Sequence, residues 1–182
     1  RAPRSLFDNR PLAGLLDSIV DFDAIHAAMS AGKLQALAVT ASSYSSGQHV
    51  TFYASREPCE PWYRTQRLAC PAQITRDHLM ASSAIPFVFP AVPLALGGHF
   101  EYFGDGAMRQ TAPISPAIHL GASRIVMIGA GRLERGLTQA AHLDPRLEYP
   151  SLGQIATHAM ACIFLDNVAS DIERLDRVNG TL

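Results

Sequence analysis

One carboxylate stands between two glycines near the middle of the chain, in the run Tyr102-Phe103-Gly104-Asp105-Gly106-Ala107. The residues from His99 to Phe103 are aromatic and β-prone, so we expect Asp105 to follow a strand directly, at a turn. A carboxylate held at such a bend can take a proton from a hydroxyl group, which is the chemistry of a general base. The alternative is a plain Asp-Gly turn between two strands, which is the commoner outcome for the bare dipeptide.

A general base made from an aspartate needs unusual surroundings. The pKa of a free aspartic acid is about 3.9, which makes its carboxylate a poor base at neutral pH. An apolar pocket raises that pKa and strengthens a hydrogen bond to a serine hydroxyl. Phenylalanines that could form such a pocket are close in the sequence: Phe87, Phe89, Phe100 and Phe103.

Further segments surround this motif in a fixed order. Upstream stands Ala81-Ser82-Ser83-Ala84-Ile85-Pro86-Phe87-Val88-Phe89, and downstream come Pro113 to Ala122 and the apolar run Ile125 to Ile128. Nearer the N-terminus lie Ser5 to Leu12 and Leu37 to Ser42. The ordered set is far more specific than any one of its members.

Together these segments resemble the patatin-like phospholipases, a family of Ser-Asp acyl hydrolases, over roughly residues 5 to 130. The resemblance implies an α/β class and a three-layer α/β/α fold, with residues 1–182 as the C-terminal part of one domain. It assigns Asp105 to a Ser-Asp dyad, with Gly104 and Gly106 shaping the turn. No metal and no cofactor is expected.

The same resemblance implies a lipid substrate. The reaction would be hydrolysis of a fatty-acyl ester or phospholipid through an acyl-serine intermediate. Ile85, Pro86 and Phe87, in the segment that precedes the motif, would line the acyl site. The protein would then be cytoplasmic or peripheral to the membrane.

The sequence departs from the family at the nucleophile. The family's serine lies in a G-x-S-x-G elbow behind a glycine-rich loop, and these 182 residues contain neither G-x-S-x-G nor G-G-G. The serines of Ser45-Ser46-Gly47 lie between two strand-like runs instead. We therefore expect an incomplete fold, inactive alone, whose exposed sheet is covered by a missing N-terminal half or by a second copy.

Other residues near the motif have weaker claims. Arg109 could meet an anionic head group, although a surface salt bridge is the commoner role. His78 and His99 are the histidines nearest the motif segments, and His99 with Glu101 could begin a metal site that lacks a third ligand. The resemblance gives Ser82 and Ser83 a packing or helix-ending role.

Two other functions stay open. One is a non-catalytic module that binds lipid or a protein partner. The other is dinucleotide binding, because Gly129-Ala130-Gly131-Arg132-Leu133-Glu134 begins like G-x-G-x-x-G. Its third glycine is replaced by Glu134, whose charge is unfavourable beside a pyrophosphate, so this function is the less favoured one.

Composition argues against several classes of function. The formal net charge of -1 gives no electrostatic case for nucleic acid. Three cysteines without a C-x-x-C pair favour a reducing compartment over a disulfide or zinc framework. No apolar run reaches the roughly 18 residues needed to span a bilayer.

Hydrophobic periodicity predicts an α/β protein in which helices and buried strands alternate. Helices are expected over Pro11–Ile19, Asp21–Ala31, Ile74–Ser83, Pro113–Leu120 and 151–178. Strands are expected over Leu34–Thr40 and Val50–Tyr53, from His99 into Asp105, and over Arg124–Ile128 as a buried strand. Arg56 to Pro71 is predicted to be a long loop.

Overall fold

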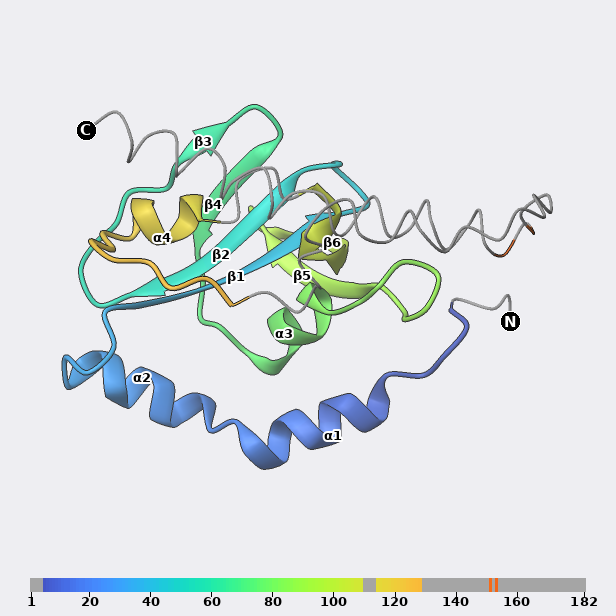
Figure 1. Ribbon diagram of the computed structural model, residues 1–182, viewed down its shortest axis with the longest axis horizontal. Helices are drawn as coiled ribbons and strands as arrows, with labels where there is room; N and C mark the ends of the chain where they lie inside the picture. Colours follow the sequence, from blue (N-terminus) through green and yellow to red (C-terminus); the bar gives the residue numbers. More distant parts are fainter. Residues whose placement is uncertain (1–4, 110–113, 129–150, 152, 154–182) are drawn as a thin grey trace, which may run out of the picture. The chain divides into compact units, whose positions relative to one another are not determined.

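The structure is a computed structural model that describes residues 5–109, 114–128, 151 and 153. The chain splits into two compact units. One unit is Arg1–Gln110 with Ile114–Ser123, and the other is Thr111–Pro113 with Arg124–Leu182. The helices and strands below all lie in the first unit (Figure 1).

The first unit combines a mixed sheet with short helices. The helices are α1 (Arg10–Ile19), α2 (Phe22–Ser30), α3 (Arg76–Ser82), the 3-10 turn η1 (Gly106–Arg109) and α4 (Ser115–His119). The strands are β1 (Ala36–Ser43), β2 (His49–Ser55), β3 (Tyr63–Arg64), β4 (Arg67–Pro71), β5 (Val92–Leu96) and β6 (His99–Asp105). Their order in the sheet is β3-β4-β2-β1-β6-β5, with β2 and β4 parallel and the other described pairs antiparallel. The predicted α/β class is confirmed.

Local sequence features stabilise the starts of both N-terminal helices. Pro11 occupies the first turn of α1, where its missing N–H has no helical partner to lose. Asp21 caps α2, because its carboxylate accepts a hydrogen bond of 2.9 Å from the amide of Ala24. These two helices confirm the predicted spans to within one residue at each end.

Helices cover both faces of the central strands. Alternate residues of a strand point to opposite faces, and Phe52 of β2 meets His78 of α3 with ring centroids 4.8 Å apart. The next residue, Tyr53, stacks on Trp62 at 5.1 Å, and Trp62 stacks on His119 of α4 at 4.6 Å. Thus α3 covers one face and α4 lies against the other.

The core lies between the sheet and α3. Its buried members come from neighbouring strands and from the segment around α3: Val39, Ala41, Val50, Phe52, Ile74, Ala81, Leu94 and Phe103. In Figure 1, α3 lies between α1 and the sheet, and it contacts both. This packing fixes the position of α3 relative to β6, which matters for the site.

Three strand predictions need correction. Arg124–Ile128 is not a strand, and Val126 and Ile128 are 88% and 93% exposed. An apolar run becomes a buried strand only where another strand offers pairing groups, and the described strands pair with one another instead. The segment Arg56–Pro71, expected to be a loop, contains β3 and β4. The strand β5 was not predicted at all. Short strands such as these depend on tertiary contacts for their pairing, so the local sequence gives little sign of them.

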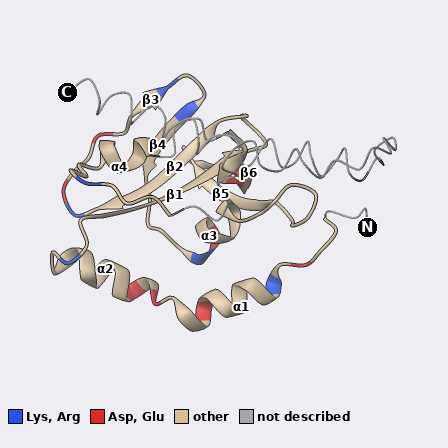
Figure 2. Ribbon diagram, in the orientation of Figure 1, with Lys and Arg blue, Asp and Glu red and all other residues tan. Residues whose placement is uncertain are grey.

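Several sequence features lie outside the described residues. They are the Gly129–Glu134 motif, the helix expected from 151 to 178 except for positions 151 and 153, and Cys162. Among the described residues, no helix is long and apolar enough to cross a membrane, and no three potential metal ligands cluster. Figure 2 shows both acidic and basic positions on α1 and α3, whereas the charged position on α2 is acidic.

Candidate active site

Asp105 lies at the last position of β6, where it is paired with Ala41 of β1. Its amide donates a hydrogen bond of 3.0 Å to the carbonyl oxygen of Ala84, just beyond the end of α3. Two segments about twenty residues apart in sequence are therefore joined at their backbones. The segment Ala81–Phe89 and the Asp-Gly motif therefore adjoin each other at Ala84 and Asp105.

The carboxylate of Asp105 is half-buried and turns back onto its own chain. Its Oδ1 accepts a hydrogen bond of 2.8 Å from the amide of Ala107. Burial raises the pKa of Asp105 above its ordinary value, and the amide of Ala107 offsets part of that rise. The direction is the one that a carboxylate needs to act as a base at neutral pH.

Both glycines of the motif allow a close approach, and neither has a positive φ. A Cβ at Gly106 would overlap the carbonyl oxygen of Thr40 and lie 2.6 Å from Thr40 Oγ1. A Cβ at Gly104 would overlap the phenol of Tyr44, 2.6 Å from its Cζ. Gly104 thus lies within β6 and Gly106 begins η1, so they shape the strand end more than a tight turn.

The three residues expected to line an acyl site follow Ala84 directly. Ile85 and Pro86 are half-buried, whereas Phe87 is 78% exposed and has a left-handed φ of 65°. The carbonyl of Phe87 accepts a hydrogen bond of 2.8 Å from the amide of Leu6.

The amide of Phe7 continues this pairing, because it donates a hydrogen bond of 2.9 Å to the carbonyl of Val88. Leu6 and Phe7 are 75% and 64% exposed. We call the exposed side chains of Leu6, Phe7 and Phe87 the apolar rim. Of its members, Phe87 follows Ala84, the backbone partner of Asp105, by three residues, and Leu6 and Phe7 join it through the two backbone hydrogen bonds.

Two of the four phenylalanines expected to form a pocket, Phe87 and Phe100, are largely exposed, whereas Phe89 is half-buried. Phe103 is fully buried and meets Phe52 in the core with ring centroids 5.4 Å apart. Phe100 lies three residues before it in the same strand and is 77% exposed, because odd and even positions face opposite sides. Asp105 is half-buried at the point where β6 pairs with β1 and bonds to Ala84 at the end of α3.

Glu101 is buried and bonds three side chains. Its Oε2 accepts hydrogen bonds from Ser43 Oγ at 2.5 Å and Ser46 Oγ at 2.8 Å, and its Oε1 lies 2.9 Å from Nε2 of His99. The bond from Ser43 is the main reason that the pKa of Glu101 is lowered, with smaller contributions from Ser46 and His99. His99 and Glu101 are therefore partners of each other rather than the start of a metal site.

The other residues named from the sequence have structural positions. His78 Nδ1 lies 2.9 Å from Thr75 Oγ1 and accepts from the Thr75 amide at 3.2 Å, so it closes the first turn of α3. Ser83 ends that helix by donating to the carbonyl of Leu79 at 2.9 Å. Neither His78 nor His99 is bonded to Asp105 among the described residues. Arg109 ends η1, and its side chain lies outside the described part.

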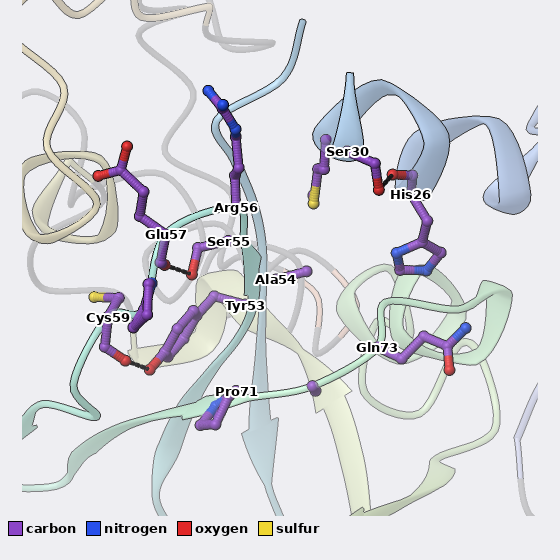
Figure 3. Close-up of a pocket in the computed structure, with 13 residues that line it drawn as sticks. His26, Ser30, Tyr53, Ala54, Ser55, Arg56, Glu57, Cys59, Pro71 and Gln73 are labelled. Carbon is purple, nitrogen blue, oxygen red and sulfur yellow. Dashed lines mark hydrogen bonds between the residues drawn. The ribbon is translucent and has the colours of Figure 1, made fainter. Parts of the chain in front are cut away.

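An open cavity of about 760 Å³ lies elsewhere in the first unit, between α2, the ends of β2 and β4 and the loop that follows β2 (Figure 3). Its hydroxyl groups are bonded within its own wall. Tyr53 donates to the carbonyl of Cys59 at 2.7 Å, and Ser55 donates to that of Glu57 at 2.7 Å. Nε2 of His26 has no partner but is itself buried, so it does not face the open space. Asp105 is not among its lining residues.

One comparison with known proteins identifies a family. The family model described as patatin-like phospholipase matches residues 1–118, which contain α1 to α3, all six described strands and Asp105. No match to the chain was found among curated proteins or among solved structures.

Proposed function

The chain belongs to the patatin-like phospholipase family, and on this premise we propose that it acts in lipid acyl hydrolysis, with Asp105 as the base of a Ser-Asp dyad. Proteins of this family are generally serine hydrolases that act on lipid acyl esters. One observation carries the proposal for this chain. The Ala84–Asp105 backbone bond holds a half-buried carboxylate of raised pKa beside the segment that would line the acyl site.

The proposed reaction has two steps. Asp105 takes the proton of a serine hydroxyl as the serine oxygen attacks the ester carbonyl. Asp105 then returns this proton to the leaving alcohol, which gives an acyl-serine and a free carboxylate. In the second step Asp105 takes a proton from water as the water oxygen attacks the acyl-serine, and it returns this proton to the serine oxygen as the fatty acid is released. No metal takes part in either step.

We propose that the serine and the oxyanion donors come from a segment other than these 182 residues, which contain no G-x-S-x-G elbow. Added alone, this chain would then have no turnover. A fatty-acyl ester or phospholipid would contact Ile85, Pro86 and the apolar rim. The protein would work in the cytoplasm or at a membrane surface.

The test is labelling with a serine-directed fluorophosphonate, with the labelled peptide identified by mass spectrometry. Wild-type chain and Asp105→Asn are compared, each alone and with any co-purifying N-terminal piece. Labelling of that piece only when Asp105 is intact supports the proposal. Labelling of a serine within residues 1–182 would contradict the assignment of the nucleophile to another segment, and equal labelling in Asp105→Asn would contradict the dyad.

A second candidate is a non-catalytic lipid-binding module. The apolar rim favours it, because Leu6, Phe7 and Phe87 expose large side chains that are grouped by two backbone hydrogen bonds. Absence of any labelling, together with retention of the chain on phosphatidylcholine vesicles, would favour this function over hydrolysis.

A further inference from the structure

Two arginines face each other across the hairpin at one edge of the sheet. Arg64 of β3 is paired directly with Arg67 of β4, in antiparallel register. Residues paired in this way point to the same face of the sheet, with Cβ atoms roughly 5 Å apart. Figure 2 shows these two basic positions on β3 and β4, with no acidic position on either strand.

The charges of this pair are not neutralised within the described part of the chain. No carboxylate there forms an ion pair with either guanidinium, whereas Arg10 and Arg76 each have an acidic partner. Among the described groups, the guanidinium of Arg64 donates only to the carbonyl of Tyr63, at 3.2 Å. Like charges on directly paired residues are destabilising, and a bound anion would relieve that cost.

The hairpin that carries the pair is anchored on an interior strand. Its turn consists of Thr65 and Gln66, and Gln66 has a left-handed φ of 59°. The carbonyl of Gln66 accepts a hydrogen bond of 2.9 Å from the amide of His49, the first residue of β2. Arg67 is itself paired with His49 in the parallel register of β2 and β4. Backbone bonds to β2 therefore hold the two arginines in register.

A polar row continues from the arginine pair toward the middle of the sheet. Arg67 is followed in register by His49 on β2 and by Ser42 on β1. These two residues are 5% and 3% exposed, and within the described part neither Nδ1 of His49 nor Oγ of Ser42 has a hydrogen-bond partner. Buried polar atoms are normally paired, so unused hydrogen-bonding capacity extends inward from the two cations.

Protection of the sheet edge explains only one of the two arginines. A charged side chain on an edge strand discourages pairing with another chain, and Arg64 on β3 is placed for that role. Arg67 lies on β4, which is paired with β3 on one side and with β2 on the other. A second cation at this interior position requires a different explanation.

We propose that Arg64 and Arg67 form a binding site for a phosphate group, carried by an anionic phospholipid or by a free phosphate ester. Each guanidinium presents several N–H donors in a planar fork that matches the oxygens of phosphate. Two such forks on one face can bind the same anion, which removes the repulsion between them. Asp105 ends β6, which is separated from β4 by β2 and β1, so the site is independent of the proposed hydrolysis.

The first test is sedimentation with vesicles of phosphatidylcholine and phosphatidylglycerol in equal parts. We expect Arg64→Gln and Arg67→Gln each to weaken binding about fivefold at low salt, because each removes one cation from the anionic surface. Wild-type binding should also weaken as salt is added, since exposed charges are screened. Arg56→Gln is the charge-matched control and should bind as the wild type does, because Arg56 is exposed just beyond the opposite end of β2 from His49.

Loss of binding is distinguishable from loss of folding. Removal of either cation relieves the repulsion, so both variants should keep or raise the wild-type Tm at low salt. Neither should change the binding of pure phosphatidylcholine vesicles, which carry no net charge. Asp105→Asn should bind the anionic vesicles as the wild type does, so failure of this site and failure of the proposed hydrolysis are separate results.

Inorganic phosphate identifies the source of the anion. Its binding is followed by NMR through the Nε–H resonances of the two arginines. Arginine-dependent binding of the anionic vesicles would assign the site to a phospholipid head group. Resonance shifts with phosphate, without such vesicle binding, would assign it to a free phosphate ester. Undiminished binding of both probes by both variants, or no binding of either probe to the wild type, would overturn the proposal.

A measurement without a ligand tests the placement of Arg67. Burial, and to a smaller extent the charge of Arg67, lowers the pKa of His49 from 6.5 to about 4. In Arg67→Gln the pKa of His49, followed by NMR, should therefore rise. An unchanged pKa would contradict the placement of Arg67 beside His49, on which the site depends.

Discussion

The amide of Asp105 and the carbonyl of Ala84 are joined by a hydrogen bond of 3.0 Å, which attaches the end of β6 to the residue that follows the cap of α3. The position of the candidate base therefore depends on how α3 packs on the sheet. Ala81, in the last turn of that helix, is fully buried in the core. The same core that stabilises the fold thus orients the carboxylate.

Asp105→Asn should make the protein more stable at neutral pH. Burial raises the pKa of Asp105 in the folded state, so folding disfavours the charged form of this side chain. At pH values above the pKa of the unfolded state, the wild-type chain therefore loses stability to this charge and the Asn variant does not. The amide oxygen of Asn can still accept from Ala107. We expect the Tm to rise by a few degrees, measured by calorimetry, while exposed Glu60→Gln leaves it unchanged. A lower Tm would show that Asp105 stabilises the fold.

Gly106→Ala should be strongly destabilising. Its Cβ would overlap the carbonyl oxygen of Thr40, which belongs to the central strand β1 and cannot move aside. We expect the free energy of unfolding to fall by about 1–3 kcal/mol, measured by urea denaturation. Gly14→Ala is the control, since a Cβ there meets nothing within 4 Å and Ala favours the helix α1. Equal effects at the two positions would refute the close approach.

Gly104→Ala should cost less, because the Tyr44 ring that it would strike is half-exposed and can swing away. Its main effect should be on Tyr44, seen as a change in the 13C resonance of that ring. In the double variant with Tyr44→Ala, the stability loss should disappear. Persistence of the full loss would mean that another group fills the space.

Stability should fall as the pH drops from about 6.5 toward 4, owing to His49. Burial, together with the charge of Arg67, lowers the pKa of His49 from 6.5 to about 4. Over this window the unfolded chain binds a proton that the folded chain does not, so acid favours unfolding. His49→Gln should flatten the profile of urea midpoint against pH between these limits. A profile as steep as that of the wild type would contradict the assignment.

The stabilisation due to Glu101 should be lost at lower pH. The folded-state pKa of Glu101 lies below its ordinary 4.5, so its contribution is complete above that value and disappears as the pH falls through the folded pKa. Glu101→Gln should lower the free energy of unfolding by about 1–3 kcal/mol at pH 7, and the difference should shrink in acid. His99→Gln should change little, because the His99 side chain is 64% exposed.

Phe87→Asn should separate stability from lipid contact. Asn tolerates the left-handed φ of 65° better than Phe, and the lost ring is 78% exposed, so stability should rise slightly. Sedimentation with phosphatidylcholine vesicles should show weaker binding, whereas Tyr63→Asn, on β3, should bind as the wild type does. Undiminished vesicle binding would remove Phe87 from the apolar rim's function.

The sequence predicted the parts whose signals are local. The hydrophobic periodicity of α1 and α2 and the aromatic run into Asp105 each act within a few residues, and the elements they predict are present. The strand over Arg124–Ile128 was wrong because pairing depends on partners far away in the chain. β5 was missed for the same reason.

The candidate site likewise has one part with a local sequence signal and other parts that depend on distant contacts. Asp105 is recognisable from its motif, but the close approach of Tyr44 to Gly104 has no sequence signal, since it arises from a turn between two other strands. The one available hint was that Gly104 leaves room for some neighbour. The binding of Glu101 to Ser43 and Ser46 likewise spans more than fifty residues and could not be read from spacing.

The stack of Tyr53, Trp62 and His119 gives the protein an intrinsic optical reporter. Trp62 is its lone tryptophan, and it lies between a phenol of β2 and an imidazole of α4 with interplanar angles of 23° and 10°. Indole emission therefore reports on one place only, the contact of α4 with the sheet. Undocking of α4 would change the colour and intensity of that emission with no label attached, and it could be timed separately from the melting of the strands.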